Sequence, residues 1–248
     1  NLIMVGPPGG GKTLLASCVP SILPAVDDSE ALEVTCIQSI TGTVSPAGLA
    51  RKRPFRRPHH TVSPAGMLGG GNPPMPGEVT LAHRGVLYLD EFCEFRPQVI
   101  ESLRGPMEDG FIIVSRSHGR VSFPSRFMLI ASANPCPCGY LGDPERACVC
   151  QGASLMRYRR RLAGPVIDRI DIQIEVPRVR RIDLERPVAF LTSDSVRHEI
   201  EHARERQSER FCRNGFTNSA MGPRHIESIA RLAPAARRLL LDAVDQMA

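Results

Sequence analysis

The sequence predicts an α/β protein in which helices flank a parallel sheet, followed by an all-helical segment. Four apolar runs of strand length are separated by helical or irregular stretches, an alternation typical of a parallel sheet. The first run leads through a glycine-rich loop into a helical pattern. After Pro177 only helical periodicity remains. We therefore expect an α/β domain at 1–177, a linker at 178–192 and a helical domain at 193–248.

The first predicted elements are a strand, a loop and two helices. Residues 2–5 (LIMV) form the first apolar run, and residues 12–23 carry apolar side chains at helical spacing. Residues 28–40 open with an Asp/Ser cap and an acidic first turn, which predicts a second helix. Residues 42–85 are rich in Gly and Pro and too long for an ordinary connection. We expect them to be an insertion with a function or a disordered loop.

The other strands follow in the second half of the α/β domain. Residues 85–92 (GVLYLDEF) predict a strand that ends in two carboxylates, and residues 96–110 predict a helix. Two β-rich runs flank SHG within 111–123, which indicates a β-hairpin. Residues 126–134 (RFMLIASAN) and 169–176 (RIDIQIEV) complete the predicted sheet.

The C-terminal residues read as helices alone. Residues 193–211 place Val196, Ile200, Ala203 and Phe211 on one apolar face, with Arg and Glu elsewhere. The helical pattern is still in progress at Ala248. We therefore expect the chain to be a fragment whose helical domain is incomplete at its C-terminus.

Composition limits the cellular location and the kinds of partner that we expect for the protein. Eight cysteines in 248 residues are too few for a disulfide scaffold, so we expect a reducing, cytoplasmic location. No apolar run approaches the roughly 18 residues that span a bilayer, which predicts no membrane segment. The formal net charge is +5, and every basic residue except Lys12 and Lys52 is Arg. This bias suits phosphate-rich partners, although a plain compositional preference for Arg is the favoured explanation.

The loop after the first strand carries a phosphate-binding motif. The stretch GPPGGGKT satisfies G-x-x-x-x-G-K-[ST] and has the strand and helix that the motif requires on either side. Its backbone N–H groups can surround phosphates, Lys12 can reach the β- and γ-phosphates, and the Thr13 hydroxyl can bind Mg²⁺. The predicted ATP-binding residues are Gly6, Pro7, Pro8, Gly9, Gly10, Gly11, Lys12, Thr13 and Leu14.

Polar residues at the ends of later strands predict hydrolysis as well as binding. Asp90 would hold the Mg²⁺ ion and Glu91 would act as general base on the attacking water. A solvated strand end explains such a pair when it stands alone, but the glycine-rich motif favours the catalytic interpretation. Asn134 ends the next strand, where it can hydrogen-bond water and γ-phosphate, or merely cap a turn. Arg169, before the last strand, can face a neighbouring subunit or be a surface arginine.

Long motifs then indicate a family. GPPGGGKT, PFRRPHH, GGGNPPMPGEVTLAHRGVLYLDE, SANPCPCGYLGDP, RYRRRLAGPVIDRIDI and ARERQSERF together resemble the magnesium-chelatase-like AAA+ ATPases of the ComM/YifB competence-protein family. The resemblance implies an AAA+ core with a helical lid. It implies Walker A roles for Lys12 and Thr13, Walker B roles for Asp90 and Glu91, sensor 1 for Asn134 and an arginine finger for Arg169.

The sequence departs from the family's pattern in two ways, and the resemblance also implies an oligomeric assembly. Relatives more often carry Thr or Ser at the position of Gly10. The family's N-terminal Lon-protease-like domain is not within these 248 residues, and we expect the sensor-2 arginine beyond them, so the fragment alone would hydrolyse ATP weakly. Family members form hexameric rings with nucleotide between subunits, which predicts a homo-oligomer.

The resemblance also implies a ring motor that translocates DNA or migrates DNA branches in transformation or recombination. Basic loops would then line the pore and contact phosphates without sequence preference. The DNA-binding candidates are Arg116 and Arg120 of the hairpin, with Arg56 and Arg57 of the stretch RKRPFRRPHH. An ordinary solvated basic face is the competing interpretation. The alternative function is an ATPase that remodels a protein partner, as in magnesium chelatase; a third is a nucleotide-binding module without activity of its own.

A cysteine-rich insertion at 135–150 follows Asn134. Its thiols, Cys136, Cys138, Cys148 and Cys150, form two C-x-C pairs nine residues apart. Four thiols can enclose structural Zn²⁺, although C-x-C is less typical of zinc sites than C-x-x-C. Unligated packed thiols are an equal alternative, and a disulfide is the weakest in a reducing setting.

Overall fold

The structure, a computed structural model, describes residues 1–46, 48–116, 119–179, 191–212 and 216–247. It divides into two compact units, Asn1–Ser193 and Asp194–Ala248. Most of the predicted linker 178–192 lies outside the described residues. In chain order the elements of the first unit are β1 (Leu2–Val5), α1 (Lys12–Ile22), α2 (Asp28–Ile40), β2 (Phe55–Arg56), α3 (Pro64–Leu68), β3 (Gly69–Gly70), β4 (Met75–Pro76), α4 (Glu78–Leu81), β5 (Val86–Leu89), η1 (Phe92–Glu94), α5 (Pro97–Ser102), α6 (Arg104–Asp109), β6 (Phe111–Arg116), β7 (Gly119–Pro124), β8 (Met128–Ala133), α7 (Gly152–Arg161), η2 (Ile167–Arg169) and β9 (Ile172–Glu175).

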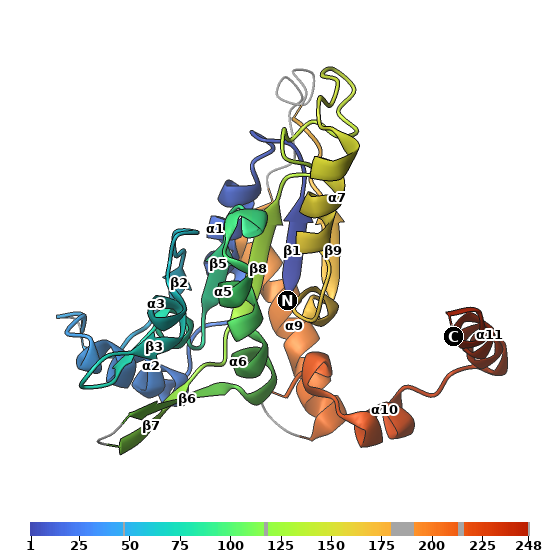
Figure 1. Cartoon of the computed structure of the whole chain (residues 1–248). Coiled ribbons are helices and arrows are strands. Elements are labelled where there is room, and N and C mark those ends of the chain that lie inside the picture. The colour runs from blue at the N-terminus through green and yellow to red at the C-terminus, as the bar shows by residue number, and fades with distance from the viewer. Residues whose placement is uncertain (47, 117–118, 180–190, 213–215, 248) are drawn as a thin grey trace. The chain divides into compact units, whose positions relative to one another are not determined.

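A five-stranded sheet forms the centre of the first unit, with the order β2-β5-β8-β1-β9 (Figure 1). Every pairing in it is parallel. The predicted fold class, a parallel sheet flanked by helices, is therefore confirmed. Because all strands run the same way, the loops after β1, β5 and β8 leave the sheet at one common edge.

Helices cover both faces of this sheet, and the side chains of β5 show why. Val86 and Tyr88 point into one core with Ala16 of α1, whereas Leu87 and Leu89 point into the other core with residues of α5 such as Val99. All four β5 residues are completely buried. Apolar side chains on both faces are what a central strand of a doubly covered parallel sheet requires.

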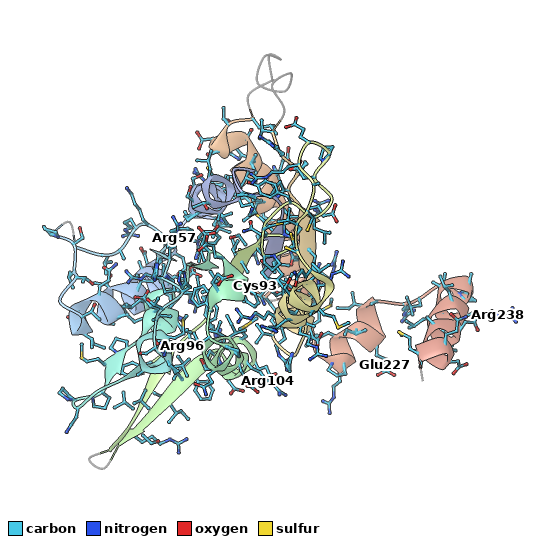
Figure 2. The ribbon with its side chains drawn as sticks, turned by 45° about the horizontal axis from the view of Figure 1, so that its top comes forward. Arg57, Cys93, Arg96, Arg104, Glu227 and Arg238 are labelled. Carbon is cyan, nitrogen blue, oxygen red and sulfur yellow. The ribbon has the colours of Figure 1, made fainter. Side chains whose placement is uncertain are left out.

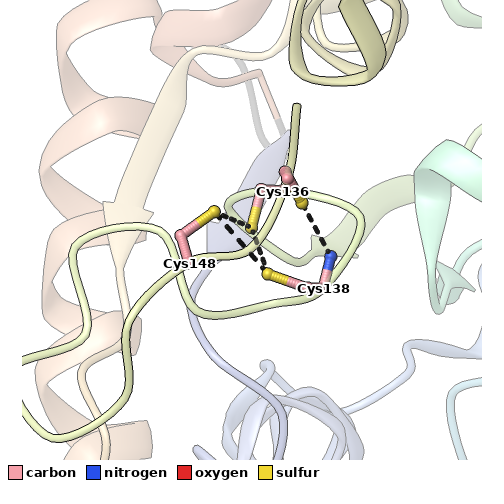
Figure 3. A group of neighbouring side chains, drawn as sticks. Cys136, Cys138 and Cys148 are labelled. Carbon is pink, nitrogen blue, oxygen red and sulfur yellow. Dashed lines mark hydrogen bonds between the residues drawn. The ribbon is translucent and has the colours of Figure 1, made fainter. Parts of the chain in front are cut away.

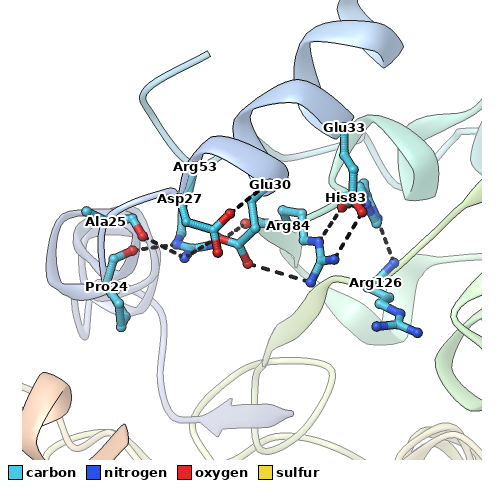
Figure 4. A network of polar contacts seen from close by, with 9 residues as sticks. All are labelled: Pro24, Ala25, Asp27, Glu30, Glu33, Arg53, His83, Arg84 and Arg126. Carbon is cyan, nitrogen blue, oxygen red and sulfur yellow. Dashed lines mark hydrogen bonds and ion pairs between the residues drawn. The ribbon is translucent and has the colours of Figure 1, made fainter. Parts of the chain in front are cut away.

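The Gly/Pro-rich segment 42–85 is ordered in the described residues and completes the sheet. It contains β2, which the sequence did not predict, because two residues are too few to show periodicity. A polar network ties the segment to α2 (Figure 4). Arg53 donates to Glu30 and to backbone carbonyls, and Arg84 pairs with Glu33. His83 completes the network, because its Nε2 lies 2.9 Å from a Glu33 carboxylate oxygen.

Two further predictions differ from the structure in detail. The helix expected at 96–110 is split at Leu103 into α5 and α6. Pro106 accounts for the break, because it has no N–H to donate to Ser102 and its ring crowds that carbonyl. The predicted hairpin forms as β6 and β7, with Arg116 paired to Gly119, although the tip residues 117–118 lie outside the described part. The last strand begins at Ile172, after the short helix η2.

The second unit is helical, as predicted. It contains α9 (Ser193–Phe211), η3 (Asn218–Ala220), α10 (Pro223–Ile229) and α11 (Pro234–Met247). The rings of Phe211, Phe216 and His225 pack together, with centroids 4.8 to 6.0 Å apart, and join the end of α9 to α10. Within the residues that the structure describes, no helix has the length and apolar character needed to cross a membrane.

Candidate nucleotide site and cysteine cluster

The glycine-rich loop between β1 and α1 surrounds the side chain of Lys12. The Nζ atom of Lys12 donates hydrogen bonds to the carbonyl oxygens of Gly6 and Pro7, at 2.6 and 2.8 Å, and to Oδ1 of Asn134 at 3.3 Å. Burial lowers the pKa of Lys12, and the nearby Asp90 carboxylate opposes this shift. The ammonium group therefore sits at the carboxyl edge of the sheet, held by groups that a phosphate oxygen could replace.

The geometry of the loop explains its glycines. Gly9 and Gly11 have φ values of +79° and +80°, in the left-handed region that favours glycine. A Cβ on Gly6 would lie 2.0 Å from the carbonyl oxygen of Val176. At Gly10 the nearest atom would be 3.3 Å away. Of the loop glycines Gly6, Gly9, Gly10 and Gly11, Gly10 could therefore carry a side chain most easily. This agrees with its place at an unconstrained position of the motif.

Asp90 follows β5 and accepts hydrogen bonds from several side chains. The Thr13 hydroxyl donates to Oδ2 at 3.0 Å, and the Arg57 guanidinium, labelled in Figure 2, donates to the same oxygen at 2.6 Å. The hydroxyls of Tyr88 and Ser132 donate to Oδ1. Burial alone would raise the pKa of Asp90, but the hydrogen bonds outweigh it, and the pKa is lowered. Asp90 therefore remains an anion, the form that binds Mg²⁺.

Glu91 adopts a conformation that is rare for its residue type. Its φ is +53°, in the left-handed region, and its side chain is 60% exposed. Its backbone N–H points at Asp90 Oδ1 and Ser132 Oγ. A carboxylate oxygen lies 3.7 Å from Nδ1 of His60. Strained backbone of this kind clusters at functional sites, and here it turns the Glu91 carboxylate out of the sheet toward solvent.

Asn134 and Arg169 lie at different ends of the sheet. Asn134 follows β8 beside Lys12, and its backbone oxygen accepts a hydrogen bond from Tyr158. Arg169 precedes β9, where it pairs with Glu108 of α6. Because β1 and β9 are parallel, Arg169 lies at the amino edge, opposite the loop that follows β1. The structure thus brings Lys12, Thr13, Asp90 and Asn134 together and leaves Arg169 apart; Leu14 is exposed on α1.

Two of the four arginines proposed for DNA contact are engaged with acidic residues. Arg56 forms a two-point ion pair with Glu78, at 2.7 and 2.8 Å, which raises the pKa of its guanidinium. Arg57 binds Asp90. Arg120 is exposed on β7. Arg116 belongs to β6 by its backbone, and its side chain lies outside the described part.

The four cysteines of the insertion converge, as Figure 3 shows for Cys136, Cys138 and Cys148. One sulfur from each of Cys136, Cys138, Cys148 and Cys150 lies within 4.8 Å of the others. The Sγ atom of Cys136 is 3.4 Å from that of Cys138 and 3.7 Å from that of Cys148. No disulfide joins them, since every cysteine is a free thiol. Backbone N–H groups of Tyr140 and Val149 lower the pKa of Cys138 to about 6.

Sequence reasoning missed the residues that orient Asp90. Ser132 lies two residues before Asn134 on β8 and, by strand alternation, faces the same way. Tyr88 has the same relation to Asp90 on β5. The alternation along each strand could therefore have identified Ser132 and Tyr88 from the sequence. The contact between Arg57 and Asp90 could not be predicted, because it depends on β2 joining the sheet beside β5.

Fold and site together define an α/β P-loop domain of the AAA+ type. Residues 1–184 match the family "Magnesium chelatase, subunit ChlI", and residues 191–248 match "Magnesium chelatase, subunit ChlI C-terminal". The Competence protein ComM of Haemophilus influenzae is 42% identical over 234 residues, which are 94% of this chain and 45% of that protein. The Uncharacterized protein YifB of Escherichia coli is 43% identical over 212 residues, 85% of this chain and 41% of that protein.

The chain belongs to the magnesium chelatase subunit ChlI family, and its similar relatives include proteins named ComM and YifB. This confirms the resemblance inferred from the motifs. The chain spans less than half the length of these two relatives.

Proposed function

We propose that this chain is the ATP-hydrolysing motor module of a ring-forming DNA translocase that serves natural transformation or recombination. The convergence of Lys12, Thr13, Asp90 and Asn134 at one edge of the sheet carries the proposal. The name of the ComM relative, a competence protein, supports the biological setting.

The residues present fit Mg²⁺ and ATP. The Thr13 hydroxyl and the Asp90 carboxylate are oxygen ligands 3.0 Å apart, and oxygen is the donor that Mg²⁺ prefers. Bound Mg²⁺ would neutralise charge on the phosphates as the terminal bond breaks. Lys12 would exchange its bonds to loop carbonyls for bonds to phosphate oxygens. Glu91 would accept a proton from the attacking water, and Asn134 would orient that water.

Assembly into a ring would complete the site with Arg169. At about 3.3 Å per strand residue, the five residue-to-residue steps from Asn1 to Gly6 separate the two sheet edges by roughly 16 Å. An arginine side chain does not bridge that distance, and Arg169 already pairs with Glu108. Its charge would therefore act on the nucleotide of a neighbouring chain, as arginine fingers supplied in trans do.

The hairpin formed by β6 and β7 is the leading DNA contact. Each strand has six residues, and Arg120 is exposed on it. Arg56 and Arg57 would have to leave Glu78 and Asp90 before they could bind phosphate.

The test is the ATPase rate of the full-length protein with and without single-stranded DNA at low salt. We expect DNA to stimulate the rate, and raised salt to remove the stimulation. Arg120→Ala should reduce the stimulation and leave the DNA-free rate unchanged. Arg238→Ala, which removes the same charge from the exposed surface of α11, is the matched control (Figure 2). No stimulation by DNA at any salt concentration would refute the motor.

A second candidate is an ATPase that remodels a protein partner, favoured by the magnesium chelatase name of the matched family. A strict requirement for a partner protein with a metal-binding domain would favour it over the motor. Intact nucleotide binding without hydrolysis in the assembled full-length protein would favour a third, a nucleotide-binding module.

A further inference from the structure

We infer that Cys136, Cys138, Cys148 and Cys150 form a structural Zn²⁺ site that holds the cysteine loop against the phosphate-binding loop. The zinc site itself is independent of the nucleotide chemistry proposed above, and only its expected effect on ATP binding rests on that proposed function.

The spacing of the sulfurs fits tetrahedral coordination. Zn–S bonds of about 2.3 Å place the sulfurs of a tetrahedral site roughly 3.8 Å apart. In the structure the Sγ separations among Cys136, Cys138 and Cys148 are 3.4, 3.6 and 3.7 Å. A disulfide would need about 2.05 Å. All four sulfurs lie within 4.8 Å of one another, so one ion could contact each of them.

The surroundings of the thiols also suit a metal. The backbone N–H of Cys138 donates to Sγ of Cys150 at 3.3 Å, the kind of outer hydrogen bond that steadies a thiolate ligand. Cys136 is buried and the other three are partly exposed, which leaves a route for the ion to enter. Zinc would displace the thiol protons into solvent on binding.

The loop that carries these thiols is held by turns and by contacts at its exposed surface. Residues 135–151 contain no helix or strand, although the structure describes all of them. Besides tight turns, such as the one closed by the hydrogen bond from Gly139 N–H to the Cys136 carbonyl at 2.9 Å, they have an exposed ion pair between Glu145 and Arg178 and the Arg146 guanidinium over the Tyr140 ring. A four-ligand ion closes two C-x-C pairs at once, and metal ions commonly supply the folding energy of such short irregular segments.

The first turn of the loop lies against the phosphate-binding loop. A Cβ on Gly139 would come within 2.7 Å of the Pro8 ring. Gly139 has a φ of +85°, so the turn needs glycine for its conformation as well. Asn134, which contacts Lys12, precedes Cys136 by two residues. A metal that fixes the turn therefore also fixes the wall of the nucleotide site formed by Pro8 and Asn134.

The first test is the zinc content of the protein purified under reducing conditions, measured by elemental mass spectrometry. We expect about one zinc per chain, falling to near zero in Cys138→Ser and Cys148→Ser. Cys36→Ser, at an exposed thiol of α2, is the matched control and should keep the ion. An absence of zinc in the parent protein, or zinc retained in both variants, would overturn the site.

Cobalt provides a readout that does not depend on variants that fold poorly. The parent protein stripped of metal should bind one Co²⁺, with visible bands typical of tetrahedral coordination and a sulfur-to-cobalt charge-transfer band in the near ultraviolet. Bands of octahedral cobalt alone would overturn the site. Removing zinc should also weaken the binding of a fluorescent ATP analogue, and readdition should restore it. Unchanged affinity would overturn the contact with the phosphate-binding loop.

Discussion

Replacing Gly6 by Ala tests how tightly the phosphate-binding loop is packed against the end of β9. The new Cβ would lie 2.0 Å from the Val176 carbonyl oxygen, whereas ordinary contacts begin at 3.4 Å. The Val176 N–H also donates to the Val5 carbonyl at 2.8 Å, so β9 cannot move away without straining its pairing with β1. The clash is between backbone atoms and a Cβ, and no side-chain rotation relieves it.

Overpacking of this kind costs about 1–3 kcal/mol. In a domain of about 150–250 residues each kcal/mol lowers the melting temperature by about 2–4 °C, so we expect a loss of roughly 2–12 °C. ATP affinity should fall as well, because a displaced Gly6 shifts the start of the loop whose backbone N–H groups would surround the phosphates. Thermal unfolding and titration with a fluorescent ATP analogue measure the two effects.

Gly10→Ala is the matched control, since its Cβ would meet no atom closer than 3.3 Å. We expect it to change the free energy of unfolding by less than about 1 kcal/mol. Tight packing at Gly6 is refuted if Gly6→Ala melts at the parent temperature, or if Gly10→Ala costs as much stability as Gly6→Ala.

Three further predictions concern the ionisable residues. Burial lowers the pKa of His83, so the folded protein holds it neutral; acidification from pH 7 to 5 should destabilise the chain because the unfolded histidine gains a proton below about 6.5. Stability is measured as the midpoint of urea unfolding, and in His83→Gln this midpoint should fall less between pH 7 and pH 5. The Glu33 carboxylate, whose pKa is about 2 in the folded protein, adds a loss of stability only below about pH 4.5. Glu91→Gln should keep ATP binding and lose most ATP hydrolysis. If this variant hydrolyses ATP at the rate of the parent protein, Glu91 is not the general base. Arg169→Ala should lower the ATPase rate of the full-length protein, and adding a Lys12→Ala partner, whose Arg169 is intact, should restore part of it; no recovery on mixing the two variants would contradict action in trans.

The sheet and the phosphate-binding loop could be predicted because local pattern determines them. LIMV and VLYL are apolar on both faces, as buried parallel strands are, and the glycine-rich motif carries its own context. The segment 42–85 could not be predicted in detail. Its order depends on Arg53 and Arg84 reaching carboxylates of α2 more than twenty residues away, as the contacts with Glu30 and Glu33 show. Pairings across such distances leave no periodic trace in the sequence.

In the candidate site, too, some residues could be predicted from local pattern and others could not. The residues at strand ends were predictable, since parallel strands place their carboxyl ends at one edge. Arg56 and Arg57 illustrate what was not: as a basic stretch they suggest phosphate binding, yet each is paired with a carboxylate. A charge count reports how many positive groups a segment carries. It does not report how many of them remain available once the fold has supplied partners.

The division of the polar residues between two sheet edges bears on how the proposed motor would be regulated. Lys12, Thr13, Asp90 and Asn134 share the carboxyl edge, and the Glu91 carboxylate points outward from it into solvent. Arg169 is held at the amino edge by Glu108. In the proposed motor one chain would therefore have the groups to bind ATP, and the arginine that stabilises the reaction would come from another chain. An isolated chain would then bind nucleotide and conserve it, and hydrolysis would begin when a neighbour brings the amino edge of its sheet to the exposed carboxylate.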